Sequence, residues 1–178
     1  LSIAADKESV NLDVWMSSPT HTQHIYNRYG EQADACITEG TAALFDGYRR
    51  MQGSSAEIAN ILNLPVILLV NARMAGYSVA PLLYGYKNFF SGVHIAGVIF
   101  NQVSSPAHYA HLREACSDTG LDCLGYLPVM EEVKLFPKHN AISLANRRII
   151  DEQANIVASQ IEKSIDINRM LNRCNRNF

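Results

Sequence analysis

The residues best suited to chemistry lie in one short loop, Glu39 to Gly47, which holds two carboxylates and two glycines. An apolar run at residues 33–38 precedes it and predicts a buried strand, so Glu39 stands at the carboxyl end of that strand. In open α/β sheets, ligands bind outside the carboxyl ends of the strands. Glu39 and Asp46 therefore stand where a magnesium ion and a phosphate group would be bound. The glycines let the backbone approach a ligand closely.

Two further predicted strands end in polar residues that suit the same edge of a sheet. A continuous aliphatic run at residues 65–70 is typical of a strand buried on both faces, and an Asn-Ala-Arg triplet at 71–73 follows it. The apolar run at 94–100 ends at Asn101. A doubly wound sheet collects such ends along one edge, so we expect them to form a nucleotide site with Glu39. The sequence shows no Walker-type loop and no G-x-G-x-x-G turn, so pattern alone indicates only a nucleotide-binding-like domain.

Helix-capping signals separate these strands. Ser-Pro pairs at 18–19 and 105–106 combine an N-cap with proline at the first helical position, and Ser54 with Glu57 forms a capping box. The predicted helices cover residues 18–29, 54–62, 78–89, 105–119 and about 146–171, and a fourth strand covers 121–127. The alternation predicts a three-layer α/β/α domain with a mostly parallel sheet, ending in a long helix.

Composition and charge are those of one ordinary globular domain. The 178 residues are 48% hydrophobic and 18% charged, with a formal net charge of -2. This balance gives no electrostatic reason to expect nucleic acid or anionic membrane as a partner. The longest apolar run, residues 64–70, is far shorter than the roughly 20 residues that span a bilayer, and a signal-peptide pattern is missing. We therefore expect a cytoplasmic protein whose four cysteines, with Cys36 in the first strand, are reduced and form neither disulfides nor a zinc site.

Four motifs occur in order along the chain: NLDVWM at residues 11–16, EG followed by LFDG at 39–47, GSSAEIA at 53–59 and GVIFNQV at 97–103. Together they resemble the cobyrinic acid a,c-diamide synthase family, over about residues 11–144. The resemblance implies a P-loop NTPase-like domain, similar to dethiobiotin synthetase, that binds ATP and magnesium. It also implies a glutaminase domain that releases ammonia. The first domain would phosphorylate a carboxylate of the corrin ring, and ammonia would displace the phosphate to give the amide.

The resemblance further implies that residues 1–178 are the second half of the ATP-binding synthetase domain. The P-loop would then precede Leu1, and the glutaminase domain would follow Phe178. We therefore expect the isolated fragment to be catalytically inactive, with cobyrinic acid and the glutaminase domain of the same full-length chain as partners. Core exposed where a strand is missing would favour self-association, of which a homodimer is one form.

The family motifs also assign roles to residues of the loop at 39–47. Glu39 matches the acid that binds magnesium beside the ATP phosphates, and its simpler interpretation is an exposed glutamate at a strand end. Asp46 matches an aspartate near the carboxylate being activated, and Gly47 accompanies it on the substrate side. The simpler interpretation of this pair is a structural Asp-Gly turn, which is common.

Three later positions match the family as well. Asn101 matches the asparagine that reads the adenine edge, for which a side-chain amide is suited because it donates and accepts at once. Pro128 matches the position where backbone lines the purine pocket, and His139 matches a histidine near the corrinoid. An Asx-turn at Asn101 and a surface role for His139 are the alternatives. Asn71 stands where the family usually has aspartate, so a role that needs a negative charge there is in doubt.

Other functions remain open at this stage. A cobyric acid synthase or a nickel-tetrapyrrole a,c-diamide synthase would share the Glu39 site and differ around Asp46 and His139. A partition-type ATPase switch would use the same sheet, but the LFDG and NLDVWM runs would then have no evident purpose. A non-catalytic, self-associating α/β module is a further possibility. A P-loop upstream would support both nucleotide hypotheses, whereas a nucleophilic cysteine downstream would support only the amidotransferase.

Overall fold

The computed structural model describes residues 2–133 and 144–175 and confirms an α/β fold with a parallel sheet. In chain order the elements are α1 (Ser2–Ala5), α2 (Pro19–Gly30), α3 (Ser55–Leu62), β1 (Val66–Asn71), α4 (Val79–Asn88), β2 (Ile95–Val103), α5 (Pro106–Thr119), β3 (Cys123–Pro128), α6 (Leu144–Ser164) and α7 (Ile167–Cys174). The described strands form one sheet in the order β1-β2-β3, and both pairs are parallel. None of the described helices combines the length and apolarity needed to cross a bilayer.

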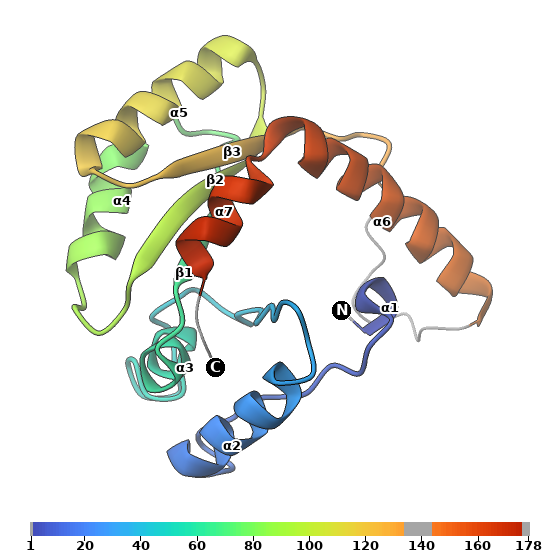
Figure 1. The fold of residues 1–178 in the computed structure, drawn as a ribbon. Coiled ribbons are helices and arrows are strands. Elements are labelled where there is room, and N and C mark those ends of the chain that lie inside the picture. The colour runs from blue at the N-terminus through green and yellow to red at the C-terminus, as the bar shows by residue number, and fades with distance from the viewer. Residues whose placement is uncertain (1, 134–143, 176–178) are drawn as a thin grey trace.

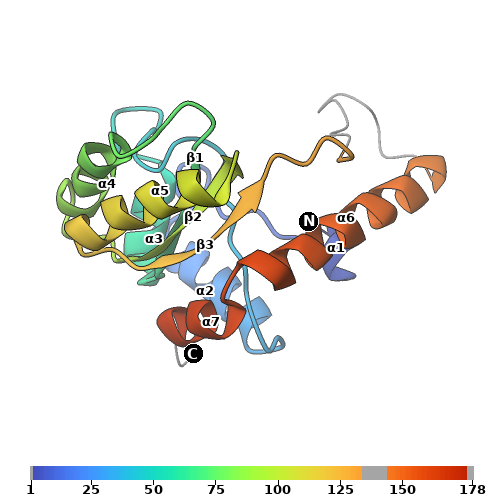
Figure 2. The ribbon, with the colours of Figure 1, turned by 90° about the horizontal axis from the view of Figure 1, so that it is seen from above.

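Helices lie on both faces of this sheet. α4 and α5 pack side by side on one face, and α7 lies against β2 and β3 on the other (Figures 1 and 2). Leu83, Phe100 and Leu112 are fully buried between the first pair of helices and the sheet. A smaller cluster around Leu124 and Ile165 lies on the α7 side. The layers are therefore α/β/α, as the alternating pattern predicts.

The predicted helix caps are confirmed. The side chains of Ser18, Ser54 and Ser105 each accept a hydrogen bond from the backbone N–H three residues further on. The capping box is present in a shifted form, because the Glu57 carboxylate accepts from the backbone N–H of Gly53, at 2.5 Å, rather than from that of Ser54. These local bonds satisfy N–H groups that a helix start leaves unpaired, which is why the helix starts can be predicted from the sequence.

The predicted strand at residues 33–38 is wrong. This segment has no regular structure and pairs with none of the described strands. Its Ile37 side chain is 86% exposed, and Cys36, predicted inside the strand, is exposed as well. A strand forms only where a neighbouring strand pairs with its N–H and C=O groups, and an apolar run alone does not supply that neighbour.

The predicted burial of β1 on both faces is also wrong. Leu68 and Val70 face the α4 side and are buried, whereas Leu69 between them is 64% exposed. On the second face of β1, Ile67 packs against the cluster around Leu124 and Ile165 and is half-buried, whereas Leu69, nearer the end of the strand, is left exposed. An aliphatic run thus overstates burial when one of the covering layers does not extend over the whole of the edge strand.

The predicted single terminal helix is two helices, α6 and α7. Between them Ile165 forms an isolated bridge with Gly125 of β3, and the Asp166 N–H donates to the Leu124 carbonyl at 2.9 Å. The Asp166 side chain then caps α7 by accepting from the Arg169 N–H at 2.9 Å. Pairing with β3 takes the backbone out of the helix, so α7 turns back onto the sheet.

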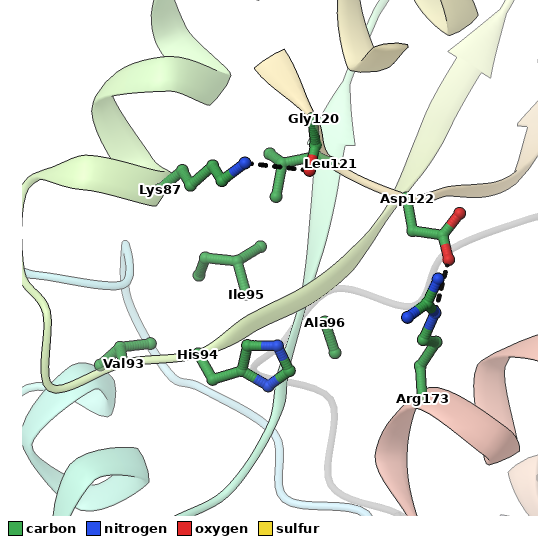
Figure 3. Close-up of a pocket in the computed structure, with 9 residues that line it drawn as sticks. All are labelled: Lys87, Val93, His94, Ile95, Ala96, Gly120, Leu121, Asp122 and Arg173. Carbon is green, nitrogen blue, oxygen red and sulfur yellow. Dashed lines mark hydrogen bonds and ion pairs between the residues drawn. The ribbon is translucent and has the colours of Figure 1, made fainter.

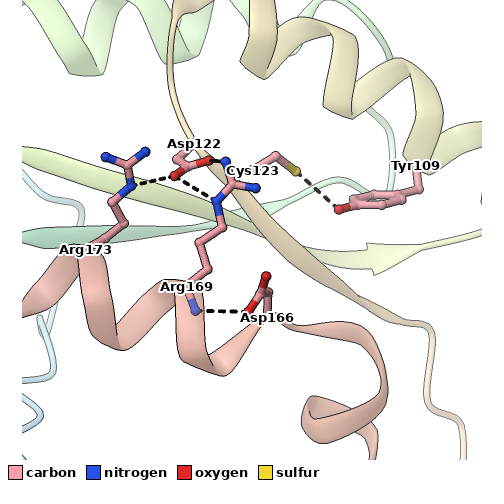
Figure 4. Close-up of polar contacts among 6 residues, drawn as sticks. All are labelled: Tyr109, Asp122, Cys123, Asp166, Arg169 and Arg173. Atoms are coloured by element: carbon pink, nitrogen blue, oxygen red, sulfur yellow. Dashed lines mark hydrogen bonds and ion pairs between the residues drawn. The ribbon is translucent and has the colours of Figure 1, made fainter.

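An ion-pair cluster fixes α7 in that position. Asp122, just before β3, has a side chain that is only 11% exposed and accepts from both Arg169 and Arg173 (Figure 4). The Arg173 Nε lies 2.7 Å from Asp122 Oδ2. Since both arginines are about half exposed, this cluster orients α7 more than it stabilises the fold.

Candidate functional site

The carboxyl edge of the sheet is the side on which β1, β2 and β3 end. Asn71 and Asn101 are register partners there, so the structure brings together two of the three predicted strand ends. The Ala72 N–H donates to the Asn101 carbonyl at 2.8 Å, which continues the pairing one residue beyond β1. Ala72 is fully buried, so this part of the edge is rigidly packed.

The two asparagine side chains are partly engaged in local turns. The Asn71 Oδ1 accepts from the Arg73 N–H at 3.0 Å, which is an Asx-turn, and the Asn101 Oδ1 accepts from the Gln102 N–H at 2.9 Å. The bond of Asn71 is thus that of an Asx-turn, whereas the Asn101 oxygen bonds the next residue and forms a local contact that is not the Asx-turn of the alternative interpretation. Each amide nitrogen still carries two N–H groups that can donate to a ligand.

A bulge follows Asn101 and brings the end of β2 against β3. Gln102 has a φ of 61°, which is uncommon outside glycine, and the strand register shifts between Phe100 and Val103. Val103 then pairs with Pro128, which is half-buried at the end of β3. Pro128 thus lies at the carboxyl edge, next to the segment that begins at Asn101.

The Asp46 segment lies elsewhere in this structure. Phe45 contacts the rings of Tyr86 and Phe89, with centroids 5.8 and 5.0 Å apart, at the C-terminal end of α4. Since α4 connects the end of β1 to the start of β2, its C-terminal end lies at the amino edge of the sheet. The structure therefore does not bring Asp46 together with Asn101.

Gly47 has a structural role in the same loop. Its N–H donates to the Arg50 carbonyl at 2.7 Å, and a Cβ at this position would lie 2.0 Å from the Gln52 carbonyl oxygen. The Asp-Gly turn therefore explains this glycine without any ligand. His139 lies outside the described residues.

Glu39 stands at the start of the same loop, is exposed and has no regular structure. Among residues 2–133 and 144–175, no three His, Cys, Asp or Glu side chains are grouped so that they could hold a metal ion. Magnesium is commonly held by one or two carboxylates together with phosphate oxygens and water. A single carboxylate such as Glu39 fits that arrangement and does not fit a protein-made zinc site.

A groove of about 450 Å³ lies at the amino edge of the sheet, where β2 and β3 begin (Figure 3). It is lined by Lys87, Val93, His94, Ile95, Ala96, Gly120, Leu121, Asp122 and Arg173. The Lys87 Nζ donates to the carbonyls of Thr119, the last residue of α5, and of Gly120, its C-cap, at 2.8 and 2.9 Å, and thereby caps that helix. The charged groups of the groove therefore already have structural partners.

Two cysteines lie close together between α5 and β3. A hydrogen bond from the buried Cys116 thiol is the main cause that lowers the pKa of Cys123, to about 6. The Tyr109 hydroxyl, 3.4 Å from the Cys123 sulfur, lowers it further (Figure 4). Burial in turn raises the pKa of Tyr109. Cys123 is thus a thiol with thiolate character, although it lies outside the carboxyl edge.

Comparison with known proteins settles the family. A family model described as an AAA domain matches residues 2–135. This chain belongs to that AAA domain family. The match includes β1, β2 and β3, so the carboxyl edge described above is part of the AAA domain. No solved structure matches the chain.

Curated relatives confirm the resemblance found in the motifs. A cobyrinate a,c-diamide synthase from Dehalococcoides mccartyi is 36% identical over 97% of this chain and 38% of the relative. One from Caldanaerobacter subterraneus is 34% identical over 92% of this chain and 37% of the relative. A hydrogenobyrinate a,c-diamide synthase from Brucella ovis is 36% identical over 92% of this chain and 36% of the relative. This chain thus spans less than two fifths of the length of these relatives.

Proposed function

We propose that this chain is part of an amidoligase that uses ATP, magnesium and glutamine to amidate the a and c carboxylates of cobyrinic acid in cobalamin biosynthesis. A carboxylate oxygen attacks the γ-phosphorus of ATP, ADP leaves, and an acyl phosphate forms. Ammonia released from glutamine attacks the acyl carbon, phosphate leaves, and the nitrogen loses a proton to give the amide. In this proposal the chain supplies part of the ATP-binding domain, and a glutaminase domain of the full-length protein supplies ammonia.

One observation carries the proposal: the similarity to cobyrinate a,c-diamide synthases extends over more than nine tenths of the chain. The geometry of the carboxyl edge is consistent with it. Asn71 and Asn101 meet there, and Pro128 follows on the neighbouring strand. This is the edge at which α/β sheets bind nucleotides.

Each predicted site residue takes a role in this proposal. Asn101 donates from its amide nitrogen to the adenine edge, and the backbone at Pro128 lines the purine pocket. Glu39 holds magnesium, which when bound neutralises charge on the phosphates during transfer. Asp46, near the carboxylate being activated, orders the loop or steadies the acyl phosphate, and Gly47 lies on the substrate side. Since Phe45 lies at the amino edge here, that role requires residues 39–47 to change position when ligands bind.

The substrate side rests on the resemblance alone. His139 would contact the corrinoid, and the relatives supply two candidate substrates, cobyrinic acid and hydrogenobyrinic acid. The second candidate rests on the Brucella ovis relative, which is as similar to this chain as the Dehalococcoides mccartyi protein, so the identities do not separate the two substrates. Both candidates present a and c carboxylates, so one mechanism serves both.

The experiment that tests the proposal uses the full-length protein. Cobyrinic and hydrogenobyrinic acid are each incubated with the protein, ATP, magnesium and glutamine, and the masses of the products are measured by mass spectrometry. The proposal predicts successive acid-to-amide mass changes that need both ATP and glutamine. Glu39→Gln should abolish them, whereas Glu31→Gln, at an exposed position after α2, should not. Absence of amide from both substrates would refute the proposal.

A further inference from the structure

His108 joins two loops of the carboxyl edge. It lies half-buried in the first turn of α5, and its Nε2 is 2.5 Å from the Ala75 carbonyl oxygen in the loop between β1 and α4. Its Nδ1 is 3.0 Å from the Ser104 hydroxyl and 3.2 Å from the Ser104 N–H, in the loop between β2 and α5. The ring therefore contacts residues that are 33 and 4 positions away in the sequence.

These contacts determine the protonation of the ring. A carbonyl oxygen can only accept, so the hydrogen of the neutral imidazole is on Nε2 and points at Ala75. The Ser104 N–H can only donate, so Nδ1 must be the unprotonated acceptor. The Ala75 carbonyl and the Ser104 N–H require the same tautomer, and both of these bonds would be lost if the hydrogen moved to Nδ1, whereas the Ser104 hydroxyl can pair with Nδ1 in either tautomer.

Together with backbone hydrogen bonds, these contacts form a closed path that passes through Asn101. The Ala75 N–H donates to the Ala72 carbonyl at 3.1 Å, and the Ala72 N–H donates to the Asn101 carbonyl at 2.8 Å. From Asn101 the chain runs through two residues to Ser104, whose N–H and hydroxyl contact the imidazole of His108. Asn101 is thus held between two loops that the imidazole ties together.

The backbone of His108 is fixed independently of its side chain. Its N–H donates to the Ser105 hydroxyl at 3.1 Å, as part of the N-cap of α5. Replacing the imidazole therefore leaves the helix start intact. His111 lies on the same helix, with 65% of its side chain exposed, and its only neighbour among the described ion pairs is Glu114 at 3.8 Å. It is a matched control.

We propose that His108 is a positioning residue for the nucleotide, which acts by holding the two loops of the carboxyl edge so that Asn101 faces the base. This inference rests on the proposed function, because it takes ATP as the ligand of that edge. A ring that bonds both loops fixes their separation, and small misplacements of binding groups lower affinity and rate strongly.

Two substitutions test the two contacts of the imidazole separately. In His108→Gln the side-chain amide nitrogen can replace Nε2 and donate to Ala75, but the Ser104 contact is lost. In His108→Asn the amide oxygen can replace Nδ1 and accept from Ser104, but the Ala75 contact is lost. The full-length protein and its variants are assayed for the KM of ATP, the KM of glutamine and the dissociation constant of ATP by calorimetry.

Because the role needs both contacts, each variant should raise the KM and the dissociation constant of ATP about tenfold. The KM of glutamine should stay within about twofold, and His111→Ala should behave as wild type. In wild type, histidine-selective ¹⁵N spectra at neutral pH should show His108 as the Nε2–H tautomer. That signature would not follow from a ring that only fills space.

Three results would overturn the role of His108: ATP affinity that is unchanged in either variant, an equal loss in His111→Ala, or an Nδ1–H tautomer in wild type. Failure of the proposed function looks different, because wild type would then form no amide. In that case the calorimetric affinity for ATP and the tautomer still decide the role of His108. Normal amide formation with unaltered ATP affinity in both variants would refute this inference alone.

Discussion

Gly125 is a position where an added methyl group would meet both an unfavourable φ and neighbouring backbone atoms. It lies in β3 with a φ of 143°, a conformation that residues with a Cβ rarely adopt. A Cβ built there would lie 2.2 Å from the Ser164 carbonyl oxygen and 2.7 Å from the Ile165 Cα. Both atoms belong to backbone, so no side-chain rotation relieves the contact, and the junction between α6 and α7 must move.

The cost of Gly125→Ala follows from two contributions. The backbone strain is about 1–2 kcal/mol. Burying an isoleucine side chain stabilises a fold by about 1.5–3 kcal/mol. Ile165 is 8% exposed beside Leu124, so moving it loses part of that stabilisation. We therefore expect the free energy of unfolding to fall by about 2–4 kcal/mol.

Urea denaturation followed by far-UV circular dichroism measures this change on the 178-residue chain. Gly85→Ala is the matched control, because Gly85 lies inside α4 and its added Cβ meets nothing within 4 Å. The control should raise stability by about 0.5–1 kcal/mol through helix propensity. A loss below about 1 kcal/mol in Gly125→Ala would refute the packing of the α6–α7 junction on β3.

Three further predictions concern other parts of the fold. Asp122→Asn should lower the free energy of unfolding, measured with urea, by about 1–2 kcal/mol. The loss should be smaller in high salt, because salt screens the half-exposed arginines that pair with Asp122. An unchanged free energy of unfolding would argue against a docked α7. Ser54→Ala should cost about 1 kcal/mol by the same assay, since the hydroxyl caps α3 from a buried position, and a neutral effect would contradict that cap. Alkylation of Cys123 by iodoacetamide should rise with pH through about 6, because its thiolate fraction grows as pH passes the lowered pKa, and then level off near neutrality. Cys116→Ala should move that rise to higher pH, and mass mapping that shows no shift would disprove the thiol pairing.

The parts of the fold that local signals determine could be predicted from the sequence. The serine caps at 18, 54 and 105 and the apolar runs that became β1, β2 and β3 depend on neighbours within a few residues or on simple burial. The prediction of a strand at 33–38 was wrong because a strand depends on a pairing partner, which an apolar run does not specify. The helix break at Ile165 was not predicted for a similar reason, since it follows from pairing with Gly125, 40 positions earlier.

The candidate site divides in the same way. Asn71 and Asn101 could be predicted as neighbours because parallel strands end at one edge, and the register confirms it. His108 was not predicted, since its link to Ala75 spans 33 residues and has no local signature beyond a histidine in the first turn of a helix. The roles of Glu39, Asp46, Gly47, Pro128 and His139 remain predictions that come from the resemblance.

The central claim is that a corrinoid carboxylate is activated by phosphoryl transfer before it is amidated. The most direct measurement uses the full-length protein with cobyrinic acid labelled with ¹⁸O in its carboxylates, together with ATP, magnesium and glutamine. If an acyl phosphate forms, one labelled oxygen leaves with each phosphate, and mass spectrometry finds ¹⁸O in the phosphate in proportion to the amide formed. Amide formation with unlabelled phosphate, or ATP hydrolysis without any amide, would contradict the account.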